Sequence, residues 1–172
     1  MRILLLRHGK SDWEAPYDGD HDRPLAPRGQ SAAAAIGRFL SEAGRAPDRI
    51  LSSTARRARD TVVIAAQSGR WAAPIVTTDA LYGAGAGEAL AAARRHMASE
   101  QERVGCLLLA GHEPTFSELT GRLIGRGRIG FPTAAVASIR FAGEDWDRVD
   151  FGAGELEFLV KPKILGRYLP EQ

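Results

Sequence analysis

Two stretches of the chain are almost uninterrupted runs of apolar residues. Residues 3–6 and 104–110 are each too short for a buried helix. Runs of this length are typical of strands that are covered on both faces in a parallel sheet. Weaker strand patterns occur at residues 48–52 and 74–78. The pattern therefore predicts four strands between the N-terminus and residue 110.

Segments with helical periodicity separate these strands. Residues 27–43 begin with a proline, which suits the first turn of a helix, and their apolar side chains repeat along one face. That face is expected to cover the sheet. Ser53 or Thr54 is expected to cap the next helix. Three further helices are predicted, at residues 54–67, at residues 87–102 and from Pro114 onward.

Beyond residue 130 the pattern changes to short segments separated by turns. Three strands in hairpin order are expected, at residues 134–141, 146–151 and 156–160, and the tail after Lys163 is expected to be loosely held. The alternation of strands and helices before them predicts an α/β fold. Its expected form is a three-layer αβα sandwich, with a mostly parallel central sheet flanked by helices. No repeat or linker divides the chain, so residues 1–172 are expected to form one domain.

Composition narrows the classes of protein to consider. The 172 residues are 44% hydrophobic and 26% charged, as in an ordinary globular protein. The formal charge of +2 implies no general affinity for polyanions. The single cysteine, Cys106, lies in an apolar run, which excludes an internal disulfide and predicts a buried thiol. No segment resembles a signal peptide or a membrane span, so a cytoplasmic location without membrane partners is expected.

The acidic loop at residues 14–28 does not fit a calcium site. Asp18, Asp20 and Asp22 are spaced as in a calcium loop, but Arg23 and Gly29 stand where that loop needs glycine and glutamate. The glycines of the segment YGAGAGEAL alternate and do not form a dinucleotide-binding fingerprint. Zinc-binding spacings of histidine or cysteine do not occur either. No metal or other cofactor is therefore expected.

A histidine follows each of the two apolar runs. His8 stands between Arg7 and Gly9 after the first run, and His112 follows the run at residues 104–110. In open α/β sheets, ligands bind at the carboxyl ends of the strands. The two imidazoles are thus placed for chemistry at one edge of the sheet. Alternatively, each histidine closes its strand as a structural residue.

Three arginines occupy the first turns of the helix at residues 54–67. Arg56, Arg57 and Arg59 carry positive charge where it opposes the helix dipole, so local stability does not account for them. An anion bound at this helix start would account for them. The alternatives are a solvated basic face or a nucleic-acid patch, and the lack of interleaved aromatic residues is weak support for nucleic acid.

Three motifs resemble those of the histidine phosphatase superfamily, also called the phosphoglycerate-mutase-like family. They are Arg7-His8-Gly9-x-Ser11-x-Trp13, Ser53-x-x-x-Arg57-Ala58-x-x-Thr61 and Gly111-His112. The resemblance covers nearly the whole chain and is closest to the small phosphohistidine phosphatases. In these proteins an acidic loop leads into Arg-Pro-Leu, as at residues 23–25, and a Leu-Tyr pair, as at residues 81–82, precedes a helix without the large insert of the mutases.

The resemblance implies a role for each matched residue. His8 would be the nucleophile and would carry a phosphohistidine intermediate, which water then hydrolyses. Arg7 and Arg57 would hold the phosphoryl oxygens in the forked geometry that guanidinium groups allow, and Ser11 would contribute to substrate binding. A protonated His112 would donate to a further oxygen.

The general acid has no secure match in the chain. The candidates are Asp18, Asp20, Glu88 and Glu113. A phosphorylated imidazole needs less help from an acid than a phosphate ester, because a protonated imidazole leaves phosphorus easily. Residues 81–104 are also too few for a large lid. The sequence therefore predicts a phosphatase with an open site, acting on phosphohistidine in another protein.

Two other hypotheses remain open. The first is a phosphoglycerate mutase or a phosphomonoesterase of small metabolites, which would use the same residues on a small phosphorylated substrate. The second is a non-catalytic module that binds phosphate or nucleic acid through Arg56, Arg57 and Arg59. A nucleic-acid partner is not expected.

Overall fold

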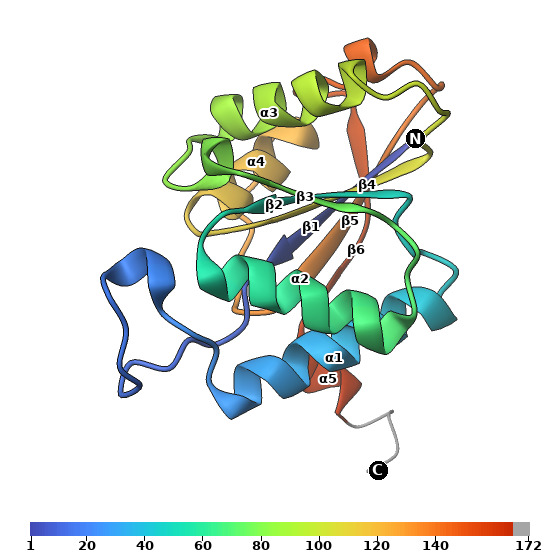
Figure 1. Ribbon diagram of the computed structural model, residues 1–172. Coiled ribbons are helices and arrows are strands. Elements are labelled where there is room, and N and C mark those ends of the chain that lie inside the picture. Colours follow the sequence, from blue (N-terminus) through green and yellow to red (C-terminus); the bar gives the residue numbers. More distant parts are fainter. Residues whose placement is uncertain (167–172) are drawn as a thin grey trace.

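A six-stranded sheet with the order β3-β2-β4-β1-β5-β6 runs through the centre of the molecule (Figure 1). The computed structural model describes residues 1–166. Strands β1 to β4 are parallel to one another, while β5 is antiparallel to β1 and β6 is antiparallel to β5. The strands are β1 (Arg2–Arg7), β2 (Arg49–Ser53), β3 (Ile75–Thr78), β4 (Cys106–Gly111), β5 (Val136–Phe141) and β6 (Gly154–Val160).

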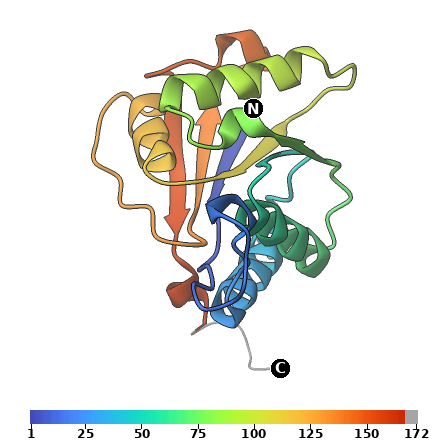
Figure 2. The same cartoon turned by 60° about the vertical axis from the view of Figure 1, so that its left-hand side comes forward.

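Helices cover both faces of this sheet (Figure 2). Helices α1, α2 and α5 lie on one face and α3 and α4 on the other. The helices are α1 (Pro27–Glu42), α2 (Arg56–Gly69), α3 (Ala86–Ala98), α4 (Thr115–Leu123) and α5 (Pro162–Leu165). The predicted three-layer α/β sandwich with a mostly parallel sheet is thereby confirmed.

Strand β1 is buried on both faces, as its sequence predicts. Alternate side chains of a strand point to opposite faces of the sheet. Leu4 therefore packs with Ile36 of α1, while Leu5 packs with Phe116 of α4. Each fully buried side chain of this size stabilises the fold by roughly 2 kcal/mol. The core thus holds β1 between two layers of helices and fixes the position of its carboxyl end.

Residues 146–151 do not form the strand that their pattern predicts. Trp146–Arg148 is a 3-10 turn, and β5 pairs directly with β6. Two aspartates account for the difference, because each bonds a nearby backbone amide. Asp145 accepts from the amide of Asp147 at 3.0 Å, and Asp150 accepts from the amide of Phe151 at 2.7 Å. Such local bonds compete with strand pairing.

Two other elements end or continue differently from the prediction. Helix α3 stops at Ala98, four residues before the predicted end at residue 102, and Ser99 caps it. The segment after Lys161 forms the short helix α5, which packs against α1 and buries Leu165. Residues 162–166 are therefore held in place, and the rest of the expected loose tail lies outside the described residues.

The only cysteine is buried beside α1 and α2, as predicted. Burial raises the pKa of the Cys106 thiol to about 12. Between residues 1 and 166, no helix combines the length and the apolar composition that crossing a bilayer requires.

Candidate active site

The carboxyl ends of β1 and β4 lie side by side and bring two histidines together. The two strands pair in parallel, with Arg7 opposite Gly111, and the His8 amide donates to the Gly111 carbonyl at 3.0 Å. The centroids of the His8 and His112 rings are 5.2 Å apart. The structure thus assembles the two imidazoles at the edge of the sheet where ligands bind in this fold class.

His8 is held in one tautomer. Its Nδ1 lies 2.7 Å from the Gly9 carbonyl oxygen, which can only accept a hydrogen bond. The ring proton is therefore on Nδ1, and Nε2 keeps its lone pair. Burial lowers the pKa of His8 to about 4, and the charges of Arg57 and Arg7 add to this effect. The imidazole is neutral at pH 7.

Gly9 connects β1 to both α1 and α2. A Cβ at this position would lie 2.7 Å from the Gly29 carbonyl oxygen at the start of α1, so the close packing requires glycine. The Gly9 amide donates to Thr61 Oγ1 at 2.9 Å, and the Thr61 hydroxyl donates to the Arg57 carbonyl at 2.6 Å. This chain of bonds fixes His8 relative to the first turn of α2.

The three arginines at the start of α2 point in different directions. The Arg57 side chain is 7% exposed, and its Nη1 and Nη2 donate to the backbone oxygen and the carboxylate of Asp20, at 2.6 and 3.0 Å. Arg56 and Arg59 are exposed, and Arg56 lies 3.4 Å from Asp60. The three guanidinium groups therefore do not form one continuous basic patch.

No side chain caps α2, although Ser53 or Thr54 was expected to do so. The N-cap residue is Ala55. Ser53 Oγ lies 2.9 Å from Nε2 of His112, and it also accepts from the Ala55 amide at 3.3 Å. Ser53 thus lies just before the helix and takes part in the site.

His112 is also neutral in the free site. Burial lowers its pKa to about 3, and the neighbouring His8 and Arg57 lower it further. The resemblance implies a protonated His112 when a phosphoryl group is bound. In the free site the ring is neutral, because it is buried among positive charges, which disfavour a further cation. The Tyr82 ring packs edge-on against His112, with centroids 5.6 Å apart.

Arg7 and Ser11 lie at the same edge of the sheet. Arg7 Nη1 donates to the Phe131 carbonyl at 2.7 Å, and burial lowers the pKa of this guanidinium. Ser11 is 5% exposed, and its Oγ has no hydrogen-bond partner in the described residues.

Several buried polar atoms of the site lack partners. Buried polar groups are normally hydrogen-bonded. Within residues 1–166 six buried side-chain atoms have no partner, and five belong to residues of this region: Arg7 Nε, Ser11 Oγ, Arg23 Nε, Arg57 Nε and His112 Nδ1. Four of the five can donate, since three are guanidinium N–H groups and one is a hydroxyl. The site is therefore suited to a ligand rich in acceptor oxygens, such as a phosphoryl group.

Arg23 and Tyr82 are site residues whose roles the sequence did not reveal. The Arg23 side chain is 8% exposed, stacks on the Trp13 ring at 3.4 Å and bonds Asp20 at 2.6 Å. The Tyr82 hydroxyl donates to Asp20 at 3.2 Å. Both positions lie in stretches that resemble the small phosphohistidine phosphatases, so that resemblance carried the signal.

The four candidate acids occupy different environments. Asp20 contacts Arg57, Arg23 and Tyr82, and their effect lowers its pKa even though burial acts in the opposite direction. Glu113 accepts from the amide and hydroxyl of Ser117, at 3.0 and 2.5 Å. Glu88 accepts from the Gly85 amide at 2.8 Å and so caps α3, and Asp18 is exposed. Of the four, only Asp20 is bonded to arginines of the site.

The site carries its positive charge on arginine side chains. Within the described residues, no three histidine, cysteine, aspartate or glutamate side chains are arranged to hold a metal ion. Guanidinium groups can hold phosphoryl oxygens directly.

Comparison with known proteins agrees with this geometry. The family model of the histidine phosphatase superfamily (branch 1) matches residues 3–105, which include the first two motifs. An uncharacterised protein of Mycobacterium tuberculosis is 37% identical over 163 residues, covering 88% of this chain and 96% of that protein. A 2,3-bisphosphoglycerate-dependent phosphoglycerate mutase of Treponema pallidum is 40% identical over 75 residues, or 41% of this chain and 30% of the mutase.

A solved structure extends the similarity to 94% of the chain. A crystal structure assigned as the phosphohistidine phosphatase SixA of Agrobacterium tumefaciens superposes with a TM-score of 0.74 at 29% identity. The superposition covers 94% of this chain and 97% of that one, and so includes the C-terminal region beyond the family-model match. The chain therefore belongs to the histidine phosphatase superfamily.

Proposed function

We propose that the protein is a phosphatase that uses His8 as its nucleophile. The observation that carries the proposal is the bond from His8 Nδ1 to the Gly9 carbonyl, which leaves Nε2 unprotonated. A nucleophilic imidazole must be neutral, and the pKa of about 4 meets that requirement at pH 7. Membership of the superfamily supports phosphatase activity.

The reaction has two steps. His8 Nε2 attacks phosphorus, a nitrogen–phosphorus bond forms, and the bond to the leaving group breaks with its electron pair staying on the leaving atom. Water then attacks the phosphohistidine, inorganic phosphate is released with one proton lost to solvent, and the neutral imidazole is restored. Both steps require an attacking atom in line with the leaving atom, and stabilised charge on three phosphoryl oxygens.

Arg7, Arg57 and His112 are proposed to stabilise those oxygens, with Ser11 contributing its unpartnered hydroxyl. The negative charge of an arriving phosphoryl group raises the pKa of His112, which otherwise lies at about 3. His112 can therefore become a charged donor when substrate is bound. Arg57 must exchange its present acceptors on Asp20 for phosphoryl oxygens.

The proposed substrate is phosphohistidine in another protein. Asp20 bonds two arginines, which hold its pKa below the usual range, so this carboxyl is ionised at neutral pH and is a poor proton donor. A phosphohistidine that carries a proton on its other ring nitrogen leaves as neutral imidazole and needs no proton from the enzyme. The similarity to a structure assigned as a phosphohistidine phosphatase supports the same substrate class.

A mutase or a small-metabolite phosphomonoesterase is the second candidate. The partial match to a phosphoglycerate mutase favours it. Such an enzyme is expected to enclose a small substrate. Here the segment between η2 (Asp79–Leu81) and β4 contains only the helix α3, which packs on the sheet. An open site of this kind favours a phosphorylated side chain on a protein.

Rapid-quench labelling tests the mechanism. The protein is mixed with a phosphohistidine peptide labelled at phosphorus, stopped within milliseconds, and digested to locate the label. We expect an acid-labile, base-stable adduct on His8. Label on another residue, or none during active turnover, would overturn the covalent mechanism.

A substrate panel tests the substrate class. Phosphohistidine, phosphoserine and phosphotyrosine peptides are compared with 3-phosphoglycerate and p-nitrophenyl phosphate under identical conditions. We expect the highest kcat/KM for the phosphohistidine peptide. Faster turnover of the phosphoserine peptide or of 3-phosphoglycerate would exclude the proposed substrate but leave the covalent mechanism standing.

A further inference from the structure

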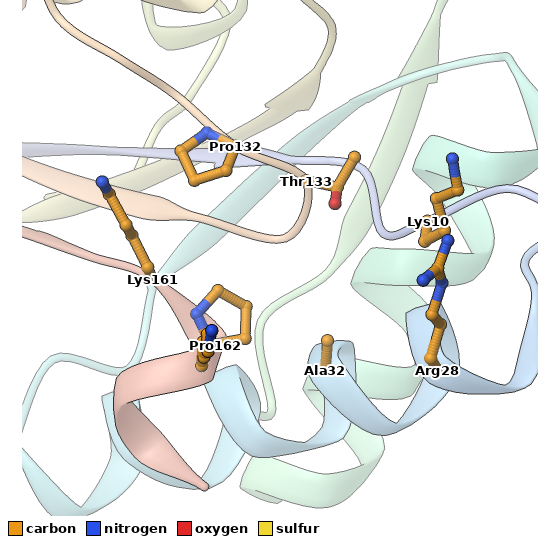
Figure 3. Close-up of a pocket in the computed structure, with 8 residues that line it drawn as sticks. Lys10, Arg28, Ala32, Pro132, Thr133, Lys161 and Pro162 are labelled. Atoms are coloured by element: carbon orange, nitrogen blue, oxygen red, sulfur yellow. The ribbon is translucent and has the colours of Figure 1, made fainter.

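A basic groove lies beside the proposed active site. It has a volume of about 720 Å³ and lies between the start of α1, the loop before β5 and the end of β6. Figure 3 shows Lys10 and Arg28 together at one end of the groove and Lys161 at the other, with Ala32, Pro132 and Pro162 between them. The charged members of the basic groove are Lys10, Arg28, Lys161 and Lys163.

These four cations have no acidic partners within residues 1–166. By contrast, Arg2 bonds one glutamate and Arg49 bonds two, all at less than 3 Å. No ion pair of the described residues includes Lys10, Arg28, Lys161 or Lys163. Like charges around one hollow repel each other, so folding alone does not explain the arrangement. The charges are available to an anionic ligand.

The loop before β5 forms a wall shared by the groove and the active site. Its Phe131 carbonyl accepts from Arg7, and its Ala134 amide donates to the His8 carbonyl at 3.0 Å. Pro132 and Thr133, between these residues, line the groove. A substrate that places its phosphoryl group at His8 can therefore extend over this loop into the basic groove.

The spacing of the charges indicates the shape of the ligand. At the proposed phosphoryl site the charges of Arg57 and Arg7 both act on the buried His8 ring, which suits one compact anion. Lys10 and Arg28 lie at one end of the groove and Lys161 lies at the other, with small apolar side chains along its length. Flexible lysines spaced in this way fit several separate carboxylates on an extended chain, rather than one phosphate.

We propose that the basic groove binds acidic residues that flank the phosphorylated side chain of a protein substrate. The inference rests on the proposed function, and it narrows the substrate class to phosphorylated segments rich in aspartate or glutamate. Complementary charge of this kind improves encounter and specificity more than the chemical step. The effect is therefore expected in KM and in its dependence on salt.

The test uses three phosphohistidine peptides of equal length, whose flanking residues are glutamates, glutamines or lysines. For the wild-type protein, we expect a KM for the glutamate peptide about 10-fold lower than for the glutamine peptide. The difference should shrink at high salt, because the groove is open to solvent. p-Nitrophenyl phosphate, which carries no flanking residues, reports the basal activity.

Paired variants assign the preference to the groove. Lys161→Gln with Lys163→Gln should reduce the difference between the two peptides to about twofold and leave p-nitrophenyl phosphate hydrolysis unchanged. The matched control, Arg126→Gln with Arg128→Gln, makes the same change in net charge at exposed positions outside the groove and should keep the preference. Lys161→Glu with Lys163→Glu should shift the preference toward the lysine peptide, which a purely structural role would not produce.

Three results would overturn the proposal. The first is an equal KM for the glutamate and glutamine peptides while p-nitrophenyl phosphate is still hydrolysed. That result would not contradict the proposed phosphatase function. The second is stronger competition by a single-stranded oligonucleotide than by the glutamate peptide at equal net charge, which would assign the groove to nucleic acid. The third is a loss of preference in the Arg126 and Arg128 control. Failure to hydrolyse any of these substrates would instead contradict the proposed function.

Discussion

The ends of β1 and β4 occupy equivalent positions in the sheet, yet they hold their histidines in different ways. Both strands are buried, parallel and adjacent, and burial lowers the pKa of both imidazoles, to about 4 for His8 and about 3 for His112. His8 bonds a backbone carbonyl, which fixes its proton on Nδ1. His112 bonds the Ser53 hydroxyl, which can donate or accept.

This difference separates two chemical tasks that a histidine can perform. A nucleophile needs a lone pair at a fixed position, and a carbonyl partner provides it by excluding the other tautomer. A residue that is neutral without substrate and charged with substrate needs a partner that tolerates both states, as a hydroxyl does. The two imidazoles are therefore not interchangeable in the proposed mechanism, although they lie 5.2 Å apart.

The largest expected effect comes from removing the imidazole at the end of β1. His8→Ala should lower the rate of hydrolysis by at least about 10⁴-fold, because no other group can form the covalent intermediate. Steady-state assays with p-nitrophenyl phosphate, together with phosphoenzyme labelling, measure the loss. His96→Ala is the control, since His96 lies on α3 beside Glu100, away from the site. Full activity in His8→Ala would contradict the proposed mechanism.

The next largest effect is expected from removing Arg57, whose charge lowers the pKa of both His8 and His112. Arg57→Ala should lower kcat/KM by roughly 10² to 10³-fold, the usual cost of losing one pre-positioned donor to a developing charge. Arg59→Ala, two residues along the same helix and exposed, should change kcat/KM by less than about twofold. Similar losses in both variants would show that the start of α2 acts only through its total charge.

A smaller loss is expected at the end of β4. His112→Ala should reduce kcat by roughly 10²-fold, the low end of the cost of losing one pre-positioned donor, while His8 still becomes phosphorylated. Rapid-quench labelling distinguishes the two variants. The adduct on His8 should still form in His112→Ala, although more slowly, whereas it cannot form in His8→Ala. Absence of the adduct in His112→Ala would contradict the proposed roles, in which His8 is the nucleophile and His112 is a donor to the phosphoryl oxygens.

The smallest expected effect is a shift in the pKa values of His8 and His112. Nuclear magnetic resonance titration of the free protein should give midpoints of about 4 for His8 and about 3 for His112, below the usual 6.5. Arg57→Ala should raise both pKa values, because the Arg57 charge lowers both. Midpoints near 6.5 would contradict the conclusion that burial and the nearby arginines keep both imidazoles neutral in the free site.

The free energy of unfolding should also depend on the protonation of His8. Unfolded histidine binds its proton near pH 6.5, whereas His8 in the folded protein binds it only near pH 4. The unfolded state thus holds more protons between these values, and the free energy of unfolding falls as the pH is lowered through this range. Denaturant titrations at several pH values should show a shallower fall in His8→Ala than in the wild type.

The sequence by itself determined the strands that deliver the site. Residues 3–6 and 104–110 are apolar enough that burial on both faces is their only stable arrangement, and the polar residues that follow them must then lie at the sheet edge. The three arginines at residues 56–59 could be singled out because positive charge at a helix start is unfavourable without an anion. Among them, the resemblance to the second family motif selected Arg57. These features are local, and for that reason the sequence reveals them.

Only the tertiary structure decided what surrounds those residues. It buried Arg57 against Asp20, and it brought Arg23 into the site. It also converted residues 146–151 from an expected strand into a turn. Each of these outcomes depends on contacts between residues far apart in the chain, or on competition between local and long-range hydrogen bonds. Hydrophobic periodicity carries no information about either, whereas burial and hydrogen bonding in the folded protein determine both.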